Sequence, residues 1–190
     1  FFGGMILLLV GFFIGMKYYK TQVPNDNVEA LLVSKGIETV GTVFTENSKT
    51  SYLYIVENIS HSTNLDLKNS LEKDLKPIFP LESGDEFLVE YVASNPKLNR
   101  IFFDKPTEKQ VQTYLKRTLA QHQKLNPDLP VTKVKCEVEI AFELKGIKGL
   151  ADFFFQNVPP EKNPNNNQNT YLRLIRDLPF QKKAADECWD

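Results

Sequence analysis

An uninterrupted apolar run opens the chain and sets the first limit on its fold. Residues 1–16 carry no charged or strongly polar side chain, and a collar of two tyrosines and two lysines follows directly. Such a run and collar are typical of a transmembrane helix with its interfacial belt. The residues expected in the anchor and its interface are Phe1, Phe2, Met5, Ile6, Leu7, Leu8, Leu9, Val10, Phe12, Phe13, Ile14, Met16, Lys17, Tyr18, Tyr19 and Lys20.

The length of this run leaves two other interpretations open, a cleaved signal peptide and a buried core helix. A bilayer needs about 20 apolar residues, with roughly 17 as the lower end, and a signal peptide has an apolar core of roughly 7–15. No A-x-A cleavage pattern follows Met16, and no nearby Cys could accept a lipid. We therefore expect an uncleaved signal-anchor of a single-pass membrane protein, with the lipid bilayer as its partner.

The side of the membrane on which the following domain lies depends on the charges that flank the anchor. Lys17 and Lys20 alone favour a cytoplasmic domain by the positive-inside rule. The chain begins at Phe1 and not at Met, so we expect residues upstream of it. Because anchors of this kind commonly have a short basic start, we prefer an extracytoplasmic domain and keep the cytoplasmic one as the alternative.

Composition places the rest of the chain among globular domains. The roughly 170 residues after the anchor are enough for one core of ordinary size or two small subdomains. With 23 basic and 24 acidic residues the net charge is −1, so no nucleic-acid partner is expected. Cys136 and Cys188 are too few for a disulfide framework. They pair if the domain faces an oxidising compartment; otherwise they are a small buried hydrophobe and a tail thiol.

Short strands dominate the predicted structure of the first half. Turn residues and β-branched runs mark most of the boundaries. The expected elements are a linker over 21–25, a helix from Asn25 or Asp26 to Gly36, strands over 38–45 and 50–56 that form a hairpin, a polar loop over 57–63, a helix over 64–75, a strand over 86–92, a turn at Asn95-Pro96 and a short strand over 100–103.

Two long amphipathic segments dominate the second half. Thr107 and Gln110 form a capping box, and apolar residues at three- and four-residue spacing then predict a helix that Asn126-Pro127 ends. Residues 133–144 alternate between apolar and mostly charged side chains, which predicts a long strand with one buried face. The remaining expectations are a segment of uncertain type over 150–158, a loop over 159–168 and a last strand over 170–178.

Together these patterns predict an α+β fold, with an N-terminal transmembrane helix followed by an antiparallel-sheet domain that contains one long amphipathic helix. The expected divisions are an anchor over 1–20, a linker and short helix over 21–35, a small β-rich subdomain over 36–105, a helix plus antiparallel strands over 106–180, and a tail without periodic pattern over 181–190.

A set of turn and strand residues in the first half gives a resemblance to known proteins. It comprises Gly36, Thr39–Val43, Tyr52–Val56, Gly84–Tyr91 and Asn95-Pro96. In these positions the chain resembles a broad family of small bacterial membrane proteins of unknown function, whose members carry a compact β domain beside one or more membrane spans. The resemblance covers about residues 36–101. It implies a β domain held at a membrane and contributes no catalytic residue.

The residues that usually carry chemistry form no recognisable site. His61 and His122 lie too far apart for a metal motif, and no G-x-S-x-G nucleophile elbow is present. A charged His122 near the end of its helix would be favoured by the helix dipole, which predicts a structural role. Glu137, Glu139 and Glu143 alternate with apolar residues, as on the solvated face of a sheet. We therefore predict no catalytic residue, metal or cofactor.

Two aromatic clusters give the one specific hypothesis about contacts. Phe102-Phe103 and Phe153-Phe154-Phe155 are dense for a domain of this size, and three consecutive rings are hard to bury on one strand or helix. Either some of these rings contact a partner or a membrane surface, or they fill a core from two sides.

The function expected from all of this is that of a membrane-tethered, non-enzymatic binding or accessory module of a membrane or envelope assembly, with membrane proteins as possible partners. A membrane-anchored hydrolase, with a site assembled from residues distant in sequence, is the first alternative. A ligand-sensing domain is the second, and it predicts a pocket without catalytic geometry.

Overall fold

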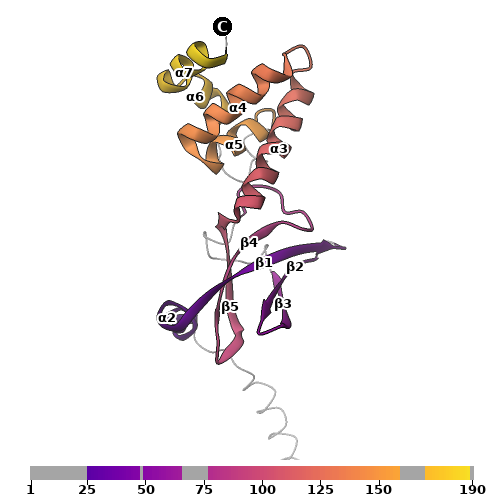
Figure 1. Ribbon diagram of the computed structural model, residues 1–190, viewed down its shortest axis with the longest axis vertical. Helices are drawn as coiled ribbons and strands as arrows, with labels where there is room; N and C mark the ends of the chain where they lie inside the picture. The colour runs from indigo at the N-terminus through magenta and orange to yellow at the C-terminus, as the bar shows by residue number, and fades with distance from the viewer. Residues whose placement is uncertain (1–24, 48, 66–76, 159–169, 189–190) are drawn as a thin grey trace, which may run out of the picture.

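The computed structural model describes residues 25–47, 49–65, 77–158 and 170–188 (Figure 1). The predicted anchor, most of the helix predicted over 64–75 and the loop predicted over 159–168 lie outside these ranges. None of the helices within them is both long and apolar enough to cross a bilayer. The elements are α2 (Asn25–Lys35), β1 (Gly36–Glu46), β2 (Lys49–Val56), β3 (Ile59–Leu65), β4 (Glu86–Val92), β5 (Asn95–Pro106), α3 (Glu108–Leu125), α4 (Val131–Lys145), α5 (Ile147–Phe154), α6 (Thr170–Ile175) and α7 (Leu178–Cys188).

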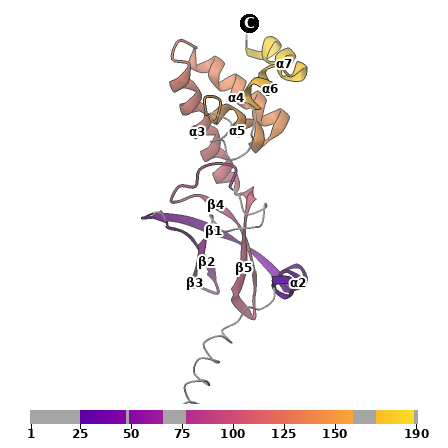
Figure 2. The same cartoon turned by 180° about the vertical axis from the view of Figure 1, so that it is seen from behind.

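The fold is α+β, as predicted, and its two kinds of structure are segregated. Five antiparallel strands form one sheet in the order β3-β2-β1-β4-β5, with β1 at its centre. Helix α3 rises from the end of β5 into a group of helices at one end of the sheet, where α4 to α7 gather (Figures 1 and 2). Helix α2 lies apart from them, beside β1, β4 and β5.

The sheet curls until its two edge strands meet. The side-chain oxygen of Asn99 on β5 accepts hydrogen bonds from the hydroxyl of Thr63 on β3, at 3.0 Å, and from the hydroxyl of Tyr52 on β2. The hydroxyl of Tyr54 donates to the carbonyl of Pro96. Buried tyrosine hydroxyls need such partners, because an unpaired polar group in a core is costly. The curled sheet encloses the apolar residues Val43, Phe87, Val89, Ile101 and Phe103.

Most of the predicted first-half elements are confirmed, with one clear error. The helix from Asn25 and the strands over 38–45, 50–56 and 86–92 match α2, β1, β2 and β4 within about two residues, and β1 and β2 pair as the expected hairpin. The predicted polar loop over 57–63 is wrong, because Ile59–Leu65 forms β3. An edge strand with both faces partly solvated needs no apolar alternation, so its polar sequence hid it.

A smaller correction concerns the turn predicted at Asn95-Pro96. These two residues begin β5, and the turn lies just before them at residues 93–94. Strand β5 is also much longer than the predicted strand over 100–103. Proline can occupy the first residues of a strand, because its missing N–H is not needed there.

Helix α3 begins as predicted, but half of its capping box is used differently. The Thr107 hydroxyl accepts a hydrogen bond from the backbone N–H of Gln110 at 3.1 Å. The Gln110 side chain does not reach back to Thr107. It accepts from the backbone N–H of Glu86 at 3.0 Å and donates to the Asp85 carboxylate at 2.9 Å, which ties α3 to the start of β4.

The long strand predicted over residues 133–144 is wrong, since this segment lies within α4. Its buried residues Val134, Val138 and Ala141 follow helical spacing, and Lys135 pairs with Glu139 one turn later at 3.7 Å. The last predicted strand, over 170–178, is also wrong: it forms α6 and the start of α7. The described part of 106–180 therefore holds helices where antiparallel strands were expected.

The tail and the two cysteines are ordered by the same helices. Residues 178–188 form α7, whose Phe180 and Ala184 are buried one turn apart. Cys188 at its end forms a disulfide with Cys136 in α4, with the Cα atoms 5.7 Å apart. The pairing that the sequence left open is thereby present in the structure, and it holds α7 against α4.

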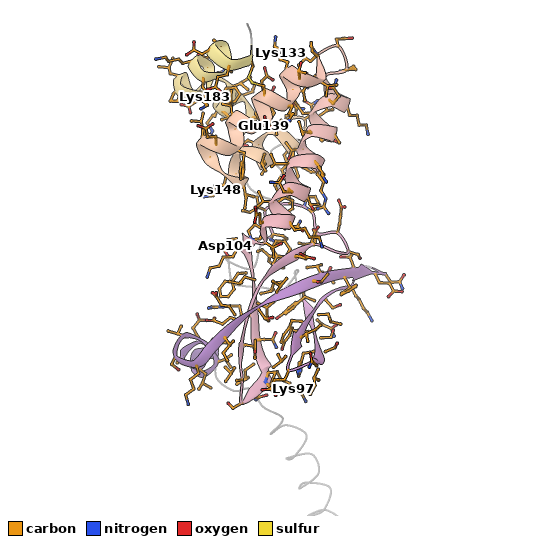
Figure 3. All side chains as sticks on the ribbon, in the orientation of Figure 1. Lys97, Asp104, Lys133, Glu139, Lys148 and Lys183 are labelled. Carbon is orange, nitrogen blue, oxygen red and sulfur yellow. A yellow bond between two sulfur atoms is a disulfide. The ribbon has the colours of Figure 1, made fainter. Side chains whose placement is uncertain are left out.

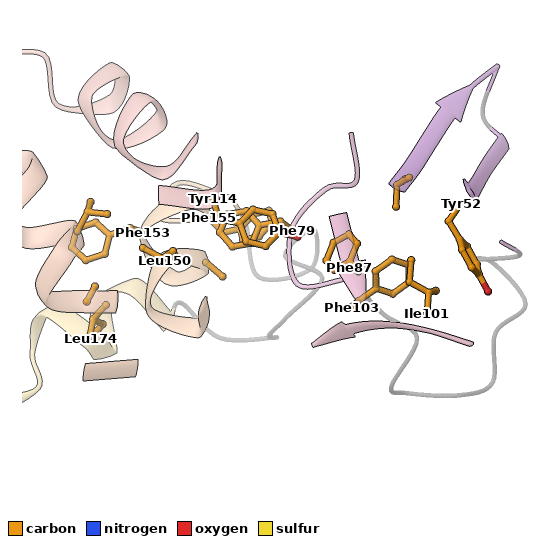
Figure 4. Packing of buried hydrophobic residues seen from close by; sticks show 14 of the residues in the cluster. Tyr52, Phe79, Phe87, Ile101, Phe103, Tyr114, Leu150, Phe153, Phe155 and Leu174 are labelled. Carbon is orange, nitrogen blue, oxygen red and sulfur yellow. The ribbon is translucent and has the colours of Figure 1, made fainter. Parts of the chain in front are cut away.

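One apolar core runs from the sheet into the helices (Figure 4). Phe79, in the loop before β4, stacks on Tyr114 of α3 with ring centroids 4.2 Å apart, and so connects the two parts. Beside this stack the buried Asp85 accepts two hydrogen bonds from the Arg117 guanidinium, at 2.6 and 3.2 Å. The helical part is therefore joined to the sheet through α3 and the loop before β4, and the helices that form the candidate sites pack on α3 and on one another.

Candidate ligand-binding cavities

A cavity of about 640 Å³ opens on the helical part, and we call it the cationic cavity. It lies where the end of α4, the start of α5 and the start of α6 meet the loop before β4. Lys148, one of its residues, lies on the side of the helices that is nearer the sheet (Figure 3). The lining residues are Ile78, Lys145, Lys148, Ala151, Asp152, Thr170 and Arg173.

Local chain geometry brings its charged residues together. Gly146 has a φ of +59°, a left-handed conformation that glycine adopts readily, and there α4 ends and α5 begins. Lys145 and Lys148 therefore flank a sharp reversal of the chain. Thr170 and Arg173 come from α6 and are three residues apart, so they share one face of that helix.

The cavity has an excess of positive charge. Among the described residues, its lining holds three cationic side chains and one carboxylate, that of Asp152. Lys145 also lies 3.8 Å from the carboxylate of Asp177, whereas Lys148 and Arg173 form no ion pair with any described residue. Burial raises the pKa of the half-buried Asp152, although a hydrogen bond with Thr170 and the charges of Lys145 and Arg173 act in the opposite direction.

A second hollow, of about 370 Å³, lies on the other side of α6, and we call it the α7 groove. Tyr171 and Ile175 of α6 form one wall and α7 forms another, while α4 contributes the carboxylate of Glu137. The lining residues are Glu137, Tyr171, Ile175, Phe180, Gln181, Ala184 and Ala185. Burial and the nearby negative charge of Glu137 raise the pKa of Tyr171.

His122 lies directly behind the α7 groove. Its side chain is only 1% exposed and contacts the edge of the Phe153 ring, with centroids 4.7 Å apart. Its Nδ1 lies 3.0 Å from the side-chain oxygen of Gln156, and its Nε2 lies 3.5 Å from Oε2 of Glu137. His122 is thus at the predicted place near the end of α3, but it faces the interior of the helical part.

The other predicted chemical candidates are not brought together. His61 stacks on Tyr54 in the sheet, with centroids 5.5 Å apart, and lies in a different part of the fold from His122. Glu139 and Glu143 are exposed and pair with Lys135 and Lys183, as a solvated face would. Glu137 differs from Glu139 and Glu143, because its side chain is only 13% exposed. Within the described ranges no group of three His, Cys, Asp or Glu side chains could hold a metal ion.

The two phenylalanine clusters divide between the core and the surface. Phe103, Phe153 and Phe155 are at most 8% exposed and belong to the core, so they are not surface contacts. Phe102 and Phe154 are half-buried. Cationic groups of Arg100 and Lys105 lie over the Phe102 ring, each 4.5 Å from its centroid. The possibility of a partner contact therefore concerns these two rings only.

The described residues of the two cavities do not form the geometry expected of a hydrolase. Counting the described residues only, the cationic cavity has one carboxylate, and the α7 groove has one carboxylate with a histidine buried behind it. Two facing carboxylates, or a nucleophile with its base, would be needed around one of these hollows. Comparison of the chain with known protein families, with curated proteins and with solved structures gives no match.

The residues of the cationic cavity were missed because their arrangement depends on α6. Lys145 and Lys148 lie between the predicted strand over 133–144 and the segment over 150–158, and the predicted strand over 170–178 would put Thr170 and Arg173 on opposite faces. The one local signal is the pair of lysines on the two sides of Gly146, at residues 145 and 148, whereas Arg173 lies far along the chain. On its own, such a pair is common on protein surfaces.

Proposed function

We propose that the chain is a membrane-tethered ligand-binding domain that takes an anionic group in the cationic cavity. The observation that supports this most directly is the charge of the lining, three cations against one carboxylate. A hollow of about 640 Å³ also falls within the range of small-molecule sites, roughly 300–1,000 Å³. Among the functions considered for this sequence, the ligand-sensing domain fits a pocket of this kind best.

The cavity suggests the chemical class of the ligand. Lys145, Lys148 and Arg173 together supply many N–H donors and no acceptor, which suits a carboxylate, sulfate or phosphate group. Ile78 and Ala151 supply an apolar wall beside these charges. We therefore infer a small organic anion, held by its charged group and by its hydrocarbon part.

The proposed membrane anchor and the proposed side of the membrane rest on residues outside the cationic cavity. We propose that residues 1–20 act as the anchor, on the apolar run and its Tyr/Lys collar. The Cys136–Cys188 disulfide supports an oxidising compartment, because cytoplasmic thiols are kept reduced in most organisms. This favours the extracytoplasmic location over the cytoplasmic one.

The location has a direct test. Cells that make the full chain are quenched with acid, and free thiols are then tagged with a maleimide large enough to shift the chain on a gel. We expect no shift before reduction and a shift for two tags after it. Two tags before reduction would place the domain in a reducing compartment and contradict the proposal.

Binding is tested on the purified full chain in lipid nanodiscs, with sodium sulfate as the probe in a calorimetric titration. We expect saturable binding that Arg173→Gln weakens about threefold to tenfold, the range of a partly exposed charge-assisted contact. Arg176→Gln removes an exposed arginine that lines neither cavity, and it is expected to bind sulfate like the unchanged chain. Equal weakening by both variants would indicate a general charge effect and no site.

The raised pKa of Asp152 gives the binding a pH dependence. A bound anion raises this pKa further, so binding takes up a proton and sulfate affinity increases as pH falls through the pKa of Asp152. Sulfate keeps its charge over this range, so the change belongs to the protein. We expect Asp152→Asn to bind sulfate more tightly at pH 7 and to lose the pH dependence. Binding by Asp152→Asn that still strengthens toward low pH would contradict this role.

A further inference from the structure

We propose that the α7 groove is a second binding site, specific for a primary ammonium group that carries a small apolar substituent, with Glu137 as the residue that binds the charge. The site lies on the opposite side of α6 from the cationic cavity and takes a ligand of opposite charge. It does not depend on the proposed function, because none of the lining residues is shared.

The first observation that supports this site is the burial of the Glu137 carboxylate. It lines the groove although its side chain is only 13% exposed, and it sits on α4 between the hollow and the core. The one basic nitrogen within 4 Å of it among the described residues is His122 Nε2, at 3.5 Å from Oε2. A carboxylate held largely out of water is costly unless it accepts hydrogen bonds, and its one basic neighbour among the described residues, His122 Nε2, forms none. An ammonium group in the groove would supply them.

The second support is the histidine behind it. His122 is 99% buried, and its Nε2 forms no hydrogen bond within the described residues although it is directed at Glu137. Its other nitrogen is engaged by Gln156 at 3.0 Å and by Asn126 at 3.2 Å, which fixes the ring. The histidine therefore lies against one oxygen of Glu137 from the core side without a hydrogen bond to it, and the carboxylate is left to accept from a ligand in the groove.

The third support is the character of the walls. Apart from Glu137, Gln181 and the Tyr171 hydroxyl, the described lining residues present hydrocarbon: Ile175, Phe180, Ala184 and Ala185. A strongly hydrated metal ion would gain little from such walls, whereas an alkyl or aryl ammonium would bury its apolar part against them. Because the carboxylate accepts hydrogen bonds, a primary ammonium fits better than a quaternary one, which has no N–H to donate.

The test compares three probes of similar size on the full chain in nanodiscs: n-butylammonium, tetramethylammonium and n-butanol. We expect saturable binding of n-butylammonium and at least tenfold weaker binding of the other two, because one lacks donors and the other lacks charge. Glu137→Gln is expected to weaken n-butylammonium binding by roughly tenfold to a hundredfold.

Glu139→Gln is the matched control, since Glu139 lies two residues away on α4, is 56% exposed and lines neither cavity. It removes the same charge and is expected to leave binding unchanged. Ala185→Leu fills the groove from α7 without touching the charge, and it should weaken n-butylammonium binding while retaining the unfolding transition. This variant keeps the test decisive if Glu137→Gln fails to fold.

Equal binding of n-butylammonium and n-butanol, or equal effects of Glu137→Gln and Glu139→Gln, would overturn the proposal. Sulfate binding separates its failure from that of the proposed function, because Glu137→Gln is expected to bind sulfate normally. In the same way, Arg173→Gln is expected to bind n-butylammonium normally.

Discussion

Removal of the Cys136–Cys188 disulfide should destabilise the helical part by an amount that the structure allows us to work out. The two cysteines are separated by 52 residues, and in the chain-entropy model a crosslink over such a loop stabilises the fold by about 4 kcal/mol. Measured effects are often smaller, so we expect a loss of about 2–4 kcal/mol in the free energy of unfolding. The loss should centre on α7, whose Phe180 and Ala184 are only 4% and 5% exposed.

The assay is urea denaturation of the full chain in nanodiscs, followed by circular dichroism, for Cys136→Ser, Cys188→Ser and the double variant. Each change breaks the same bond, so all three should cost nearly the same, and the double variant should not show the sum. At a slope of about 2 kcal/mol/M, the midpoint should fall by roughly 1–2 M urea.

Two results would refute this reasoning. Strictly additive costs of the two single variants would mean that each cysteine acts through its own packing and not through a shared bond. A midpoint unchanged by the double variant would mean that the apolar contacts of α7 suffice without the crosslink. Addition of a reductant to the unchanged chain provides an independent check, because it should reproduce the double variant.

Three further predictions concern packing. Asp85→Asn should cost about 3–5 kcal/mol by denaturation, because Arg117 loses its buried carboxylate partner and keeps only the exposed carboxylate of Glu82, at 2.9 Å. Asp104→Asn, at an exposed site, should be near neutral in the same assay. Gly149→Ala should cost at least about 2 kcal/mol in the same assay, since its Cβ would lie 2.0 Å from a carbonyl oxygen of α4. Phe154→Ser should lower the thermal midpoint modestly, because the half-buried Phe154 ring packs on Phe79. The variant should still unfold in a cooperative transition, and loss of that transition would contradict a surface role for the ring.

Local sequence signals predicted most of the sheet because its strands meet strong local requirements. The turn before β4 needs Gly84, which has a φ of +97°, and the β1–β2 hairpin follows from turn residues between two β-branched runs. Strand β3 was missed because it satisfies its backbone through β2 and carries mostly polar side chains. No local pattern distinguishes such an edge strand from a polar loop.

The helical part was mispredicted where two periodicities coincide. Apolar residues at 134, 138 and 142 are four apart, so they share a face in a helix as well as in a strand. The charged residues between them give the alternation of apolar and charged side chains that is typical of a strand. Helix α7 had a recognisable signal, with Phe180, Ala184 and Cys188 at four-residue intervals. The disulfide partner of Cys188 depends on how α7 packs, which a single sequence does not reveal.

The choice between strand and helix decides which residues can form a site. In a strand, Glu137, Glu139 and Glu143 share one face, and they therefore appeared as one solvated row. In a helix, Glu139 and Glu143 are one turn apart, while Glu137 turns away from Glu139 by about 200°. This rotation places Glu137 beside His122 and the α7 groove and leaves the other two paired with surface lysines. The same holds for α6, where residues 170 and 173 would face opposite sides of a strand but line one cavity in the helix. Both candidate sites therefore arise from the change of period from two to 3.6 residues.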